Sequence, residues 1–447
     1  NRGGHKGVNR EDSFFVAAVH IHKSQCKLMQ YLRFRSLYLY HYNIGMNTHK
    51  TLAVLLTAVS SLMLFSCGEP ASLSAAAQAE LADFDMTYTD KTAATVIKEM
   101  GNGTNLGNTM EAVWSSDLDG GMPKTSLRMM QGLKKAGFDS VRIPVAWSKG
   151  MQTESGSDYK IYTYFMNRVK EVVSYALAAD LYVVLNVHWD NGWWKGFADS
   201  DMAVRKETMR RYERLWTQIA QEFALWPEKL ILEGANEELG EFSCNGGSLT
   251  DDERYKVTNE INQKFVDIVR SSGGNNTGRV LLIAGYNTDI TKTCDEGKAR
   301  FKMPSDIHGA DDARLMISVH YYTPWDYCGC NDPENPPNYG HNFKTWGSEE
   351  DIALMRNLFT MMKTNFSNKG YPVIIGEYEV IHWKSGSLKD GTMDFLGTVV
   401  SLSKELGFCS MLWDCNSWYN RTGLRWNFDG LSAIYSRKQF VKNSYKK

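Results

Sequence analysis

Eight short apolar segments alternate with amphipathic segments between residue 93 and residue 447, and this alternation restricts the fold more than any other feature of the sequence. The amphipathic segments have apolar residues at spacings of three and four, as surface helices do, and lie at residues 127–136, 165–179, 203–224, 257–269, 352–362 and 395–406. The strand-like segments lie at residues 103–107, 138–145, 181–187, 229–236, 279–285, 315–321, 371–377 and 407–413. Eight strands separated by helices predict an α/β fold, the (β/α)8 barrel.

An open, doubly wound sheet is the alternative arrangement of such elements. That class often carries a glycine-rich phosphate-binding loop after its first strand. The run GNGTNLG at residues 101–107 lacks the spacing of the dinucleotide fingerprint, and no helical pattern follows it directly. The sequence also shows neither an internal repeat nor a proline-rich linker. We therefore expect residues 93–447 to form a single domain.

The N-terminal part of the sequence has a different character. Residues 1–45 crowd Arg, His, Lys and Tyr together without a period, and we interpret them as an upstream segment that is not part of the folded protein. Met46 opens a segment with a polar start and an apolar run at residues 52–65, which is too short to span a bilayer and is typical of a secretory signal. The mature protein is therefore expected outside the cytoplasm.

The end of this signal, LFSCG at residues 64–68, resembles a bacterial lipoprotein signal, in which the cysteine is lipidated. The resemblance implies a signal peptide at residues 46–67 and a lipid anchor at Cys67, and we expect no other contact with a membrane. An ordinary signal peptide with a cleavage site within residues 75–79 is the alternative. Residues 68–92 are small and polar, as a tether is. We expect a periplasmic or cell-surface lipoprotein, or a secreted protein.

Charge and cysteine content exclude several kinds of partner. The formal net charge is -1, which provides no long-range field to attract nucleic acid. The cysteines beyond residue 92 do not have the spacing of a metal site, and we expect at most one disulfide between distant loops. We expect neither a metal nor a cofactor. A monomer is expected because no apolar helix face is left over.

Two predicted strands each end in a single carboxylate. Residues 229–237 read KLILEGANE and residues 371–377 read YPVIIGE, so Glu237 and Glu377 follow apolar runs typical of strands buried on both faces. In a closed parallel barrel the carboxyl ends of the strands meet at one rim, where active sites are built. The sequence thus predicts a facing pair of glutamates at the ends of the fourth and seventh strands. The alternative is that each is an ordinary solvated loop residue.

Other predicted strands also finish in polar or aromatic side chains. Arg142 lies among β-branched residues, where a guanidinium is costly unless it is paired, so it either holds a carboxylate or lies under the site. The remaining candidates are His188, Trp189 and Trp193 after the third strand, Asn236 after the fourth, His320 and Tyr322 after the sixth, and Trp413 after the eighth. The tryptophans suit stacking against a sugar ring, although aromatic side chains more often fill cores. Trp114, Trp194, Trp325 and Trp418 are further candidates of this kind.

Two carboxylates without a metal cluster favour acid/base and nucleophilic catalysis at a bond between uncharged groups. Cleavage of a glycosidic bond is the typical reaction of this kind. One carboxyl must be protonated to supply the leaving group, and the other must be ionised to attack. Arg142 is suited to keep a glutamate ionised, with a hydrogen bond from Tyr322. Asn236 is suited to bind a sugar hydroxyl. Trp413 would form an apolar floor for the sugar ring.

Seven motifs occur in the order NLGNTMEA, VRIPVAW, VVLNVHWD, ILEGANE, SVHYYTPW, PVIIGE and MLWD. In this order they resemble glycoside hydrolase family 5, the cellulase-containing family on the TIM barrel, and within it the bacterial endo-β-1,4-glucanases of subfamily 4. The resemblance runs from about residue 101 to at least residue 413. It implies a retaining endo-β-1,4-glucanase whose acid/base is Glu237 and whose nucleophile is Glu377. Arg142, His188, Asn236, His320, Tyr322 and Trp413 would complete the site.

Two positions depart from the family pattern. The family usually has Asn-Glu-Pro, whereas Glu238 follows Glu237 here. This second carboxylate either raises the pKa of the acid or points to solvent. The subfamily often has His-His after the third strand, and Trp189 replaces the second histidine, which puts a contact with a sugar hydroxyl in doubt.

The expected partner is a β-glucan polysaccharide, and the choice of polymer stays open. A xyloglucanase, a xylanase or a β-mannanase on the same frame is the alternative among enzymes, because loop contacts decide which hydroxyls and branches are accepted. The alternative from another class is a surface glycan-binding lipoprotein that has kept the barrel and lost turnover.

Overall fold

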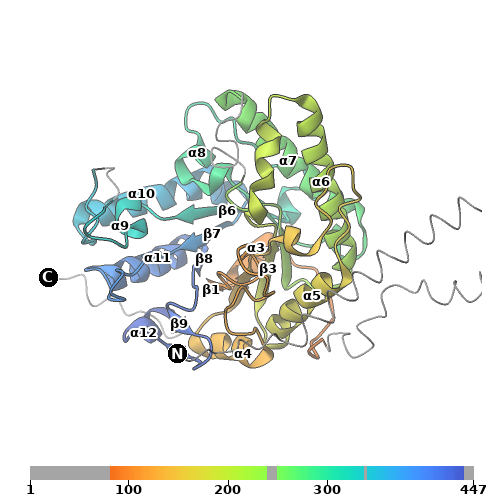
Figure 1. Ribbon diagram of the computed structural model, residues 1–447. Helices are drawn as coiled ribbons and strands as arrows, with labels where there is room; N and C mark the ends of the chain where they lie inside the picture. The colour runs from red at the N-terminus through yellow and green to blue at the C-terminus, as the bar shows by residue number, and fades with distance from the viewer. Residues whose placement is uncertain (1–80, 239–248, 337–339, 437–447) are drawn as a thin grey trace, which may run out of the picture. The chain divides into compact units, whose positions relative to one another are not determined.

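The computed structural model describes residues 81–238, 249–336 and 340–436, and within them eight parallel strands close into a barrel in sequence order. Each strand pairs with the next along the chain, and the first pairs with the last (Figure 1). The strands are β1 Asn102–Asn105, β2 Ser140–Ile143, β3 Tyr182–Asn186, β4 Leu230–Glu233, β5 Leu281–Ala284, β6 Leu315–Tyr321, β7 Val373–Tyr378 and β8 Cys409–Leu412. The predicted (β/α)8 barrel is confirmed, and the open doubly wound sheet is excluded.

Helices surround the ring of strands (Figure 1). The longer ones are α4 Leu127–Ala136, α5 Thr163–Ala178, α6 Met202–Glu222, α7 Asp251–Ser271, α10 Glu349–Asn365 and α11 Thr392–Leu406. The shorter ones are α3 Ala93–Glu99, α8 Ile290–Cys294, α9 Trp325–Gly329 and α12 Leu431–Tyr435. Segments of 3-10 helix lie at Trp147–Gly150, Asp190–Ala198, Gly274–Thr277, Tyr286–Thr288, Ala310–Asp312 and Ser367–Lys369. Strand β9 Tyr419–Asn420 pairs with β10 Arg425–Trp426.

Local chemistry sets the ends of these helices. Helix α4 begins where the Ser126 side chain accepts a hydrogen bond from the backbone of Met129. It ends at Gly137, whose φ of 112° belongs to the left-handed region. A Cβ at Gly137 would also approach the carbonyl oxygen of Tyr435 to 2.1 Å, so the close packing of α12 requires a glycine here.

A cluster of buried side chains closes one end of the barrel. Ala93, Val96 and Met100, from helix α3 and its C-cap, pack with alternate residues of the strands, such as Tyr182 and Val184 of β3. Helix α3 precedes β1, so it covers the N-terminal end of the strands, and Figure 1 places it within the ring. The opposite, C-terminal rim is thereby left for the polar side chains that end the strands.

The predicted upstream segment, signal peptide and lipid anchor at Cys67 lie outside the described residues. Residues 81–92, the end of the predicted tether, are bonded to the barrel: the backbone of Thr89 donates to Glu228 at 3.0 Å, and Asp90 pairs with Arg314. Among the helices described, none combines the length and the apolar character needed to cross a bilayer. Cysteines 294, 328, 330, 409 and 415 are free thiols, and Cys244 lies outside the described residues.

Candidate active site

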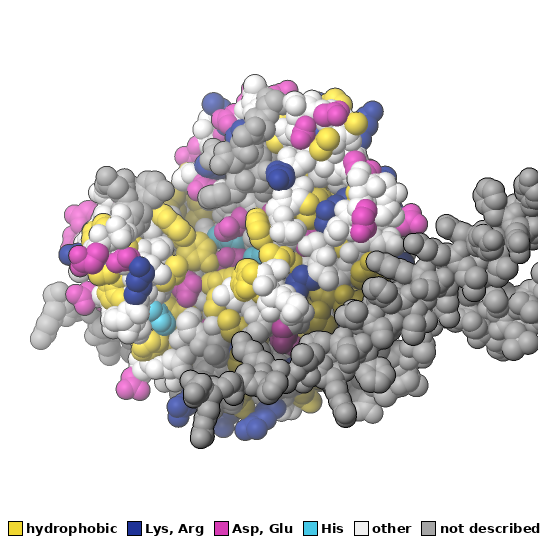
Figure 2. Space-filling model, viewed as in Figure 1, with side chains coloured by type: hydrophobic (Ala, Val, Ile, Leu, Met, Phe, Trp, Pro, Cys, Tyr) yellow, Lys and Arg dark blue, Asp and Glu magenta, His cyan; other side chains and the backbone are white. Residues whose placement is uncertain are grey.

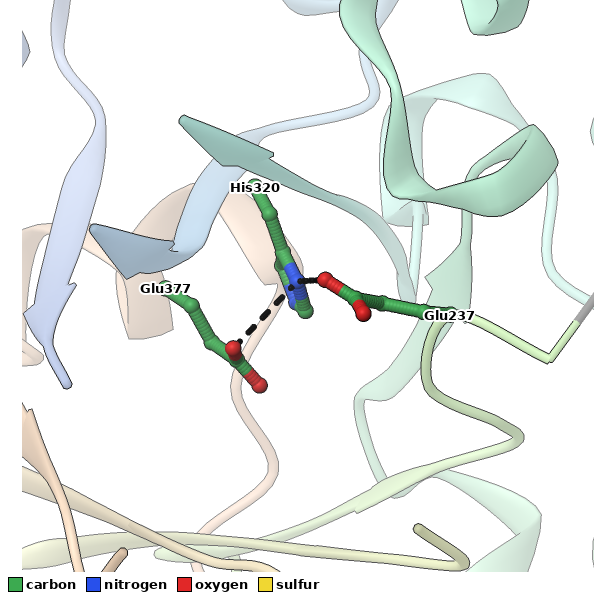
Figure 3. A group of neighbouring side chains, drawn as sticks. All are labelled: Glu237, His320 and Glu377. Carbon is green, nitrogen blue, oxygen red and sulfur yellow. Dashed lines mark hydrogen bonds and ion pairs between the residues drawn. The ribbon is translucent and has the colours of Figure 1, made fainter. Parts of the chain in front are cut away.

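Two glutamates and a histidine from three different strands meet at the C-terminal rim. Glu377 lies in β7, His320 lies in β6, and Glu237 lies in the turn that follows β4. The pairing of β6 with β7 shifts by one residue between Val319 and His320, and this bulge sets His320 beside Glu377. Figure 3 shows the two glutamates reaching toward His320 from opposite sides. In Figure 2 the surface over the barrel is hollowed, with His and Asp or Glu side chains among hydrophobic ones.

The three side chains are close enough to act on one atom. His320 Nδ1 lies 2.7 Å from Glu237 Oε1 and 3.6 Å from Glu377 Oε2. One polar atom from each of the three lies within 4.8 Å of the others. Carboxyl groups roughly 5 Å apart are those of retaining glycosidases, whereas an inverting pair is wider because a water must fit between. The spacing therefore suits attack by one carboxylate on a carbon while the other transfers a proton.

A buried arginine in β2 holds one of the two glutamates. Arg142 is completely buried, and its Nη1 donates to Glu377 at 2.7 Å and to Asn105 at 3.0 Å. Its Nε donates to Glu233 at 2.6 Å, and its Nη2 donates to Asn236 at 2.7 Å. The guanidinium charge thus lies between two carboxylates, which raise the pKa of Arg142 above its ordinary value against the effect of burial.

The environment of Glu377 supports an ionised carboxyl group. Burial raises the pKa of Glu377 above its ordinary value, and the positive charge of Arg142 opposes this rise. The two oxygens receive separate hydrogen bonds, one from Arg142 at 2.7 Å and one from the Tyr322 hydroxyl at 3.0 Å. Burial holds the pKa of Tyr322 well above its usual range, so the phenol keeps its proton and remains a donor. Two donors directed at one carboxyl favour its charged form.

Glu237 has a different environment. Its side chain is 41% exposed toward the hollow, but the atoms packed around its carboxyl group desolvate it and raise its pKa to about 7, against the effect of Arg142. Its bonded partner is His320, whose pKa burial lowers to about 4, so the imidazole is neutral near pH 7. One glutamate thus carries its proton more readily than the other, which is the division of roles that an acid and a nucleophile require.

The predicted His188 and Trp413 lie together on the same rim. Their rings are stacked with centroids 5.7 Å apart and planes inclined by 12°. His188 Nδ1 lies 3.3 Å from the amide nitrogen of Asn186, which sets the ring orientation. Burial is the main cause that holds the pKa of His188 well below 6.5, so this ring is also neutral. Trp413 is half-buried, which leaves part of the indole free for a ligand.

The predicted tryptophans divide into three kinds. Trp189 is 50% exposed, and Trp114 and Trp325 are exposed as well. Trp194 and Trp418 are completely buried and belong to the core, so these two candidates are not available to stack against a sugar. Trp193 is half-buried, donates to Asp190 at 2.7 Å and stacks on Trp194 at 4.5 Å, while the guanidinium of Arg211 lies 4.5 Å from its ring. Trp193 is thus held by protein groups on several sides.

The structure also shows what the residue after Glu237 does. Glu238 is buried, which excludes the alternative that it points to solvent. It folds back onto Asn236, and desolvation rather than Glu238 raises the pKa of Glu237. Asn105 and Glu233, which the sequence analysis did not single out, complete the set of groups bound to Arg142.

Among the described residues, Glu237, His320 and Glu377 are also the one group of carboxylate, imidazole or thiol side chains with the spacing of a metal site. The guanidinium of Arg142 lies 2.7 Å from Glu377, and its positive charge opposes a cation beside that carboxylate. We therefore interpret the three side chains as reacting groups rather than as ligands.

Several known proteins resemble this chain in sequence and in fold. The family model for cellulase (glycosyl hydrolase family 5) matches residues 79–418. A xyloglucan-specific endo-beta-1,4-glucanase of Bacteroides ovatus is 38% identical over 291 residues, which are 62% of this chain and 54% of that protein, so the chain spans about half the length of this relative. Endoglucanase A of Paenibacillus barcinonensis is 33% identical over 345 residues, covering 72% of this chain and 82% of its own length. A solved GH5-4 broad specificity endoglucanase from an uncultured bovine rumen ciliate superposes with a TM-score of 0.65 at 33% identity, over 77% of this chain and 97% of that one.

Proposed function

Because this chain belongs to glycosyl hydrolase family 5, we propose that it is a retaining endo-β-1,4-glucanase that hydrolyses internal bonds of soluble or amorphous β-glucans. The observation that carries the proposal is the pair of carboxyl groups of Glu237 and Glu377, held within 4.8 Å on either side of a neutral histidine. Their environments differ, since one has a pKa of about 7 and the other is bonded to a guanidinium.

In the first step the ionised Glu377 attacks the anomeric carbon. A bond forms from its carboxylate oxygen to that carbon, the bond from the carbon to the leaving oxygen breaks, and Glu237 gives its proton to the leaving oxygen. The pKa of about 7 leaves Glu237 largely protonated in weakly acidic solution. The hydrogen bonds from Arg142 and Tyr322 hold Glu377 in place and keep it charged until it reacts.

In the second step a water molecule replaces the first leaving group. Glu237 is now ionised and takes a proton from the water, whose oxygen attacks the anomeric carbon and breaks the ester bond to Glu377. The two inversions retain the configuration of the sugar. His320 is neutral, and in the tautomer protonated at Nε2 its Nδ1 accepts a hydrogen bond from the protonated Glu237 in the first state.

The neighbouring side chains supply binding surfaces for the sugar. The amide of Asn236 is suited to a hydroxyl of the ring that reacts, and the stacked pair of His188 and Trp413 offers it a flat apolar face. The exposed indole of Trp189 is suited to a neighbouring ring. Because these contacts involve no charge, an uncharged polysaccharide is the substrate class that they support.

A xyloglucanase is the second candidate, and one observation favours it: the Bacteroides ovatus relative, 38% identical to this chain, is specific for xyloglucan. A xylanase or a β-mannanase on the same frame, and a glycan-binding protein without turnover, are further outcomes that the following experiment separates.

The purified protein is incubated with carboxymethylcellulose, barley mixed-linkage glucan, xyloglucan, xylan and glucomannan, while viscosity and new reducing ends are recorded. We expect a steep fall in viscosity with few new ends on the β-glucans, because cleavage is internal. The fastest substrate identifies the specificity. No release from any polymer by folded protein, with binding retained, would support the glycan-binding protein instead.

The lipid anchor at Cys67 is part of the same proposal. Expression of the full chain and of Cys67→Ala in a bacterial host, with radiolabelled palmitate, should label only the unchanged chain. Labelling of both, or of neither, would contradict the anchor.

A further inference from the structure

Glu238 makes two hydrogen bonds to a residue that lies two positions earlier in the chain. Its carboxyl oxygen Oε2 accepts from the backbone N–H of Asn236 at 3.0 Å, and Oε1 accepts from the side-chain amide of Asn236 at 3.4 Å. Glu238 is only 4% exposed, so water does not replace these partners easily. The two bonds close a tight loop around Glu237, which lies between the two residues and is left to project into the hollow.

The orientation of the Asn236 amide is fixed by its other neighbour. Its oxygen accepts a hydrogen bond from Nη2 of Arg142 at 2.7 Å. A flipped amide would direct its NH2 group at a guanidinium, which only donates, so the oxygen must face Arg142. The amide nitrogen then faces Glu238, the acceptor on that side. One of its two hydrogens is used there.

We propose that Glu238 is a positioning residue, which holds Asn236 and the turn that carries Glu237 in the geometry needed for sugar cleavage. This inference rests on the proposed function. The contacts form a continuous series from Glu238 through Asn236 and Arg142 to Glu377, so the residue beside the acid is connected to the nucleophile. Both carboxyl oxygens of Glu238 are bonded to Asn236, so this group acts through Asn236 and not on the reacting atoms.

The charge on Glu238 is consistent with this role. Burial, with a further contribution from Glu237, holds the pKa of Glu238 well above its usual range. A protonated Glu238 still accepts the backbone N–H of Asn236, and it does not repel Glu237 when that residue becomes ionised between the two steps. Glutamine at this position can keep the bond to the backbone but presents an NH2 group to the amide of Asn236.

The test compares Glu238→Ala, Glu238→Gln, Asn236→Ala and the Glu238→Ala/Asn236→Ala double variant, with Glu111→Ala as the matched control. Glu111 is 5% exposed and also accepts backbone N–H groups from residues just before it, those of Asn108 and Thr109, but it lies outside the series of contacts described above. The readouts are kcat and KM on the polymer that the unchanged protein cleaves fastest, and the melting temperature.

We expect Glu238→Ala to lower kcat about 10- to 100-fold, because small displacements of reacting groups have effects of this size. Glu238→Gln should lose less than the alanine variant, since it keeps the backbone bond. The double variant should lie within about threefold of Asn236→Ala, because residues that act through one another are not additive. Glu111→Ala should lower the melting temperature while kcat stays within about twofold.

A kcat of Glu238→Ala within about twofold of the unchanged protein would overturn the inference, as would losses that multiply fully in the double variant. If the unchanged protein cleaves none of the polymers, the proposed function fails and hydrogen exchange tests the positioning alone. Exchange at residues 235–238 that is faster in Glu238→Ala than in Glu111→Ala supports it, and equal exchange overturns it. Should Glu238→Ala fail to fold, Glu238→Gln takes its place in both measurements.

Discussion

Arg142 and Arg279 are both completely buried in the barrel, yet they bind different kinds of groups. Arg142, in β2, donates to four side chains, of which Glu233 and Glu377 are carboxylates. Arg279 precedes β5 and donates mainly to backbone carbonyls, those of Phe223, Trp226, Pro227 and Leu230, and to the side chain of Asn276.

The difference is visible in the pKa values of the two groups. Carboxylates raise the pKa of Arg142 despite its burial. Burial lowers the pKa of Arg279 to about 10, because carbonyl dipoles do not compensate a charge as a carboxylate does. Arg279 ties the connection between α6 and β4 to the start of β5, at the N-terminal end of the barrel. Arg142 places its positive charge beside the side chains of the C-terminal rim. In a TIM barrel the N-terminal end of the strands serves stability, and the C-terminal end serves function.

The comparison predicts that substitutions on the Arg142 side act on rate and those on the Arg279 side act on stability. The largest effect should come from Glu237→Gln, which cannot donate a proton to the leaving group. We expect a loss of roughly 10²- to 10⁴-fold in kcat on a β-glucan, as for other general acids. An aryl glycoside with a dinitrophenolate leaving group, which needs no proton, should be attacked in the first step at nearly the unchanged rate. Full activity of this variant on the polymer would contradict the assignment of the acid.

The next effect should come from Arg142→Lys. Lysine keeps the positive charge but cannot reproduce a planar fork that bonds Glu233, Glu377 and Asn236 together. We expect kcat to fall about 10²-fold, comparable to the loss of one charge-stabilising donor in other enzymes. Circular dichroism at the assay temperature checks that the variant is folded. A kcat within about fivefold of that of the unchanged protein would contradict a role of Arg142 in the reaction.

The pH dependence should show two limbs on the Arg142 side. Glu237 must be protonated in the first step, and its pKa is about 7, so kcat/KM should fall about tenfold per pH unit above that value. Glu377 must be ionised, so activity should also fall as the pH drops through its pKa, which burial raises above 4.5. Arg279→Lys should keep both limbs. Activity that stays constant to pH 9 would show that another group donates the proton.

The smallest effect on activity should come from Arg279→Lys. Lysine leaves several of the carbonyls that Arg279 binds without a partner in a buried region. We expect the free energy of unfolding to fall by roughly 2–4 kcal/mol, with kcat within about twofold at a temperature where the variant is folded. Urea denaturation measures the first quantity. A large loss of kcat with unchanged stability would remove the distinction between the two arginines.

The sequence predicted the barrel because apolar periodicity is strong in buried parallel strands. The prediction was less accurate where polar contacts, and not apolar periodicity, set the start of a helix. The predicted helix at residues 257–269 starts at Asp251 in the structure, because Thr250 and Glu253 form a capping box ahead of the apolar pattern. Helices α3 and α8, of seven and five residues, are too short to show a period.

Within the site, the strand-end residues could be predicted because a parallel barrel brings these ends together. The partners of Arg142 inside the strands could not be predicted as easily. Glu233 stands within the apolar run of β4, just as Arg142 stands within β2, and two opposite charges in buried strands are a signal that they pair. No such signal predicted the burial of Glu238. A carboxylate that follows another in the sequence is expected to be solvated unless the conformation of the turn is known.

The stereochemistry of the first product tests the central claim most directly. The purified protein cleaves cellotetraose or another short β-1,4-glucan, and proton NMR follows the anomeric signals of the new reducing end before mutarotation. With Glu237 and Glu377 acting in a double displacement at this spacing, the β anomer should appear first and the α anomer only later. Initial formation of the α anomer would contradict the account, because it requires a single attack by water.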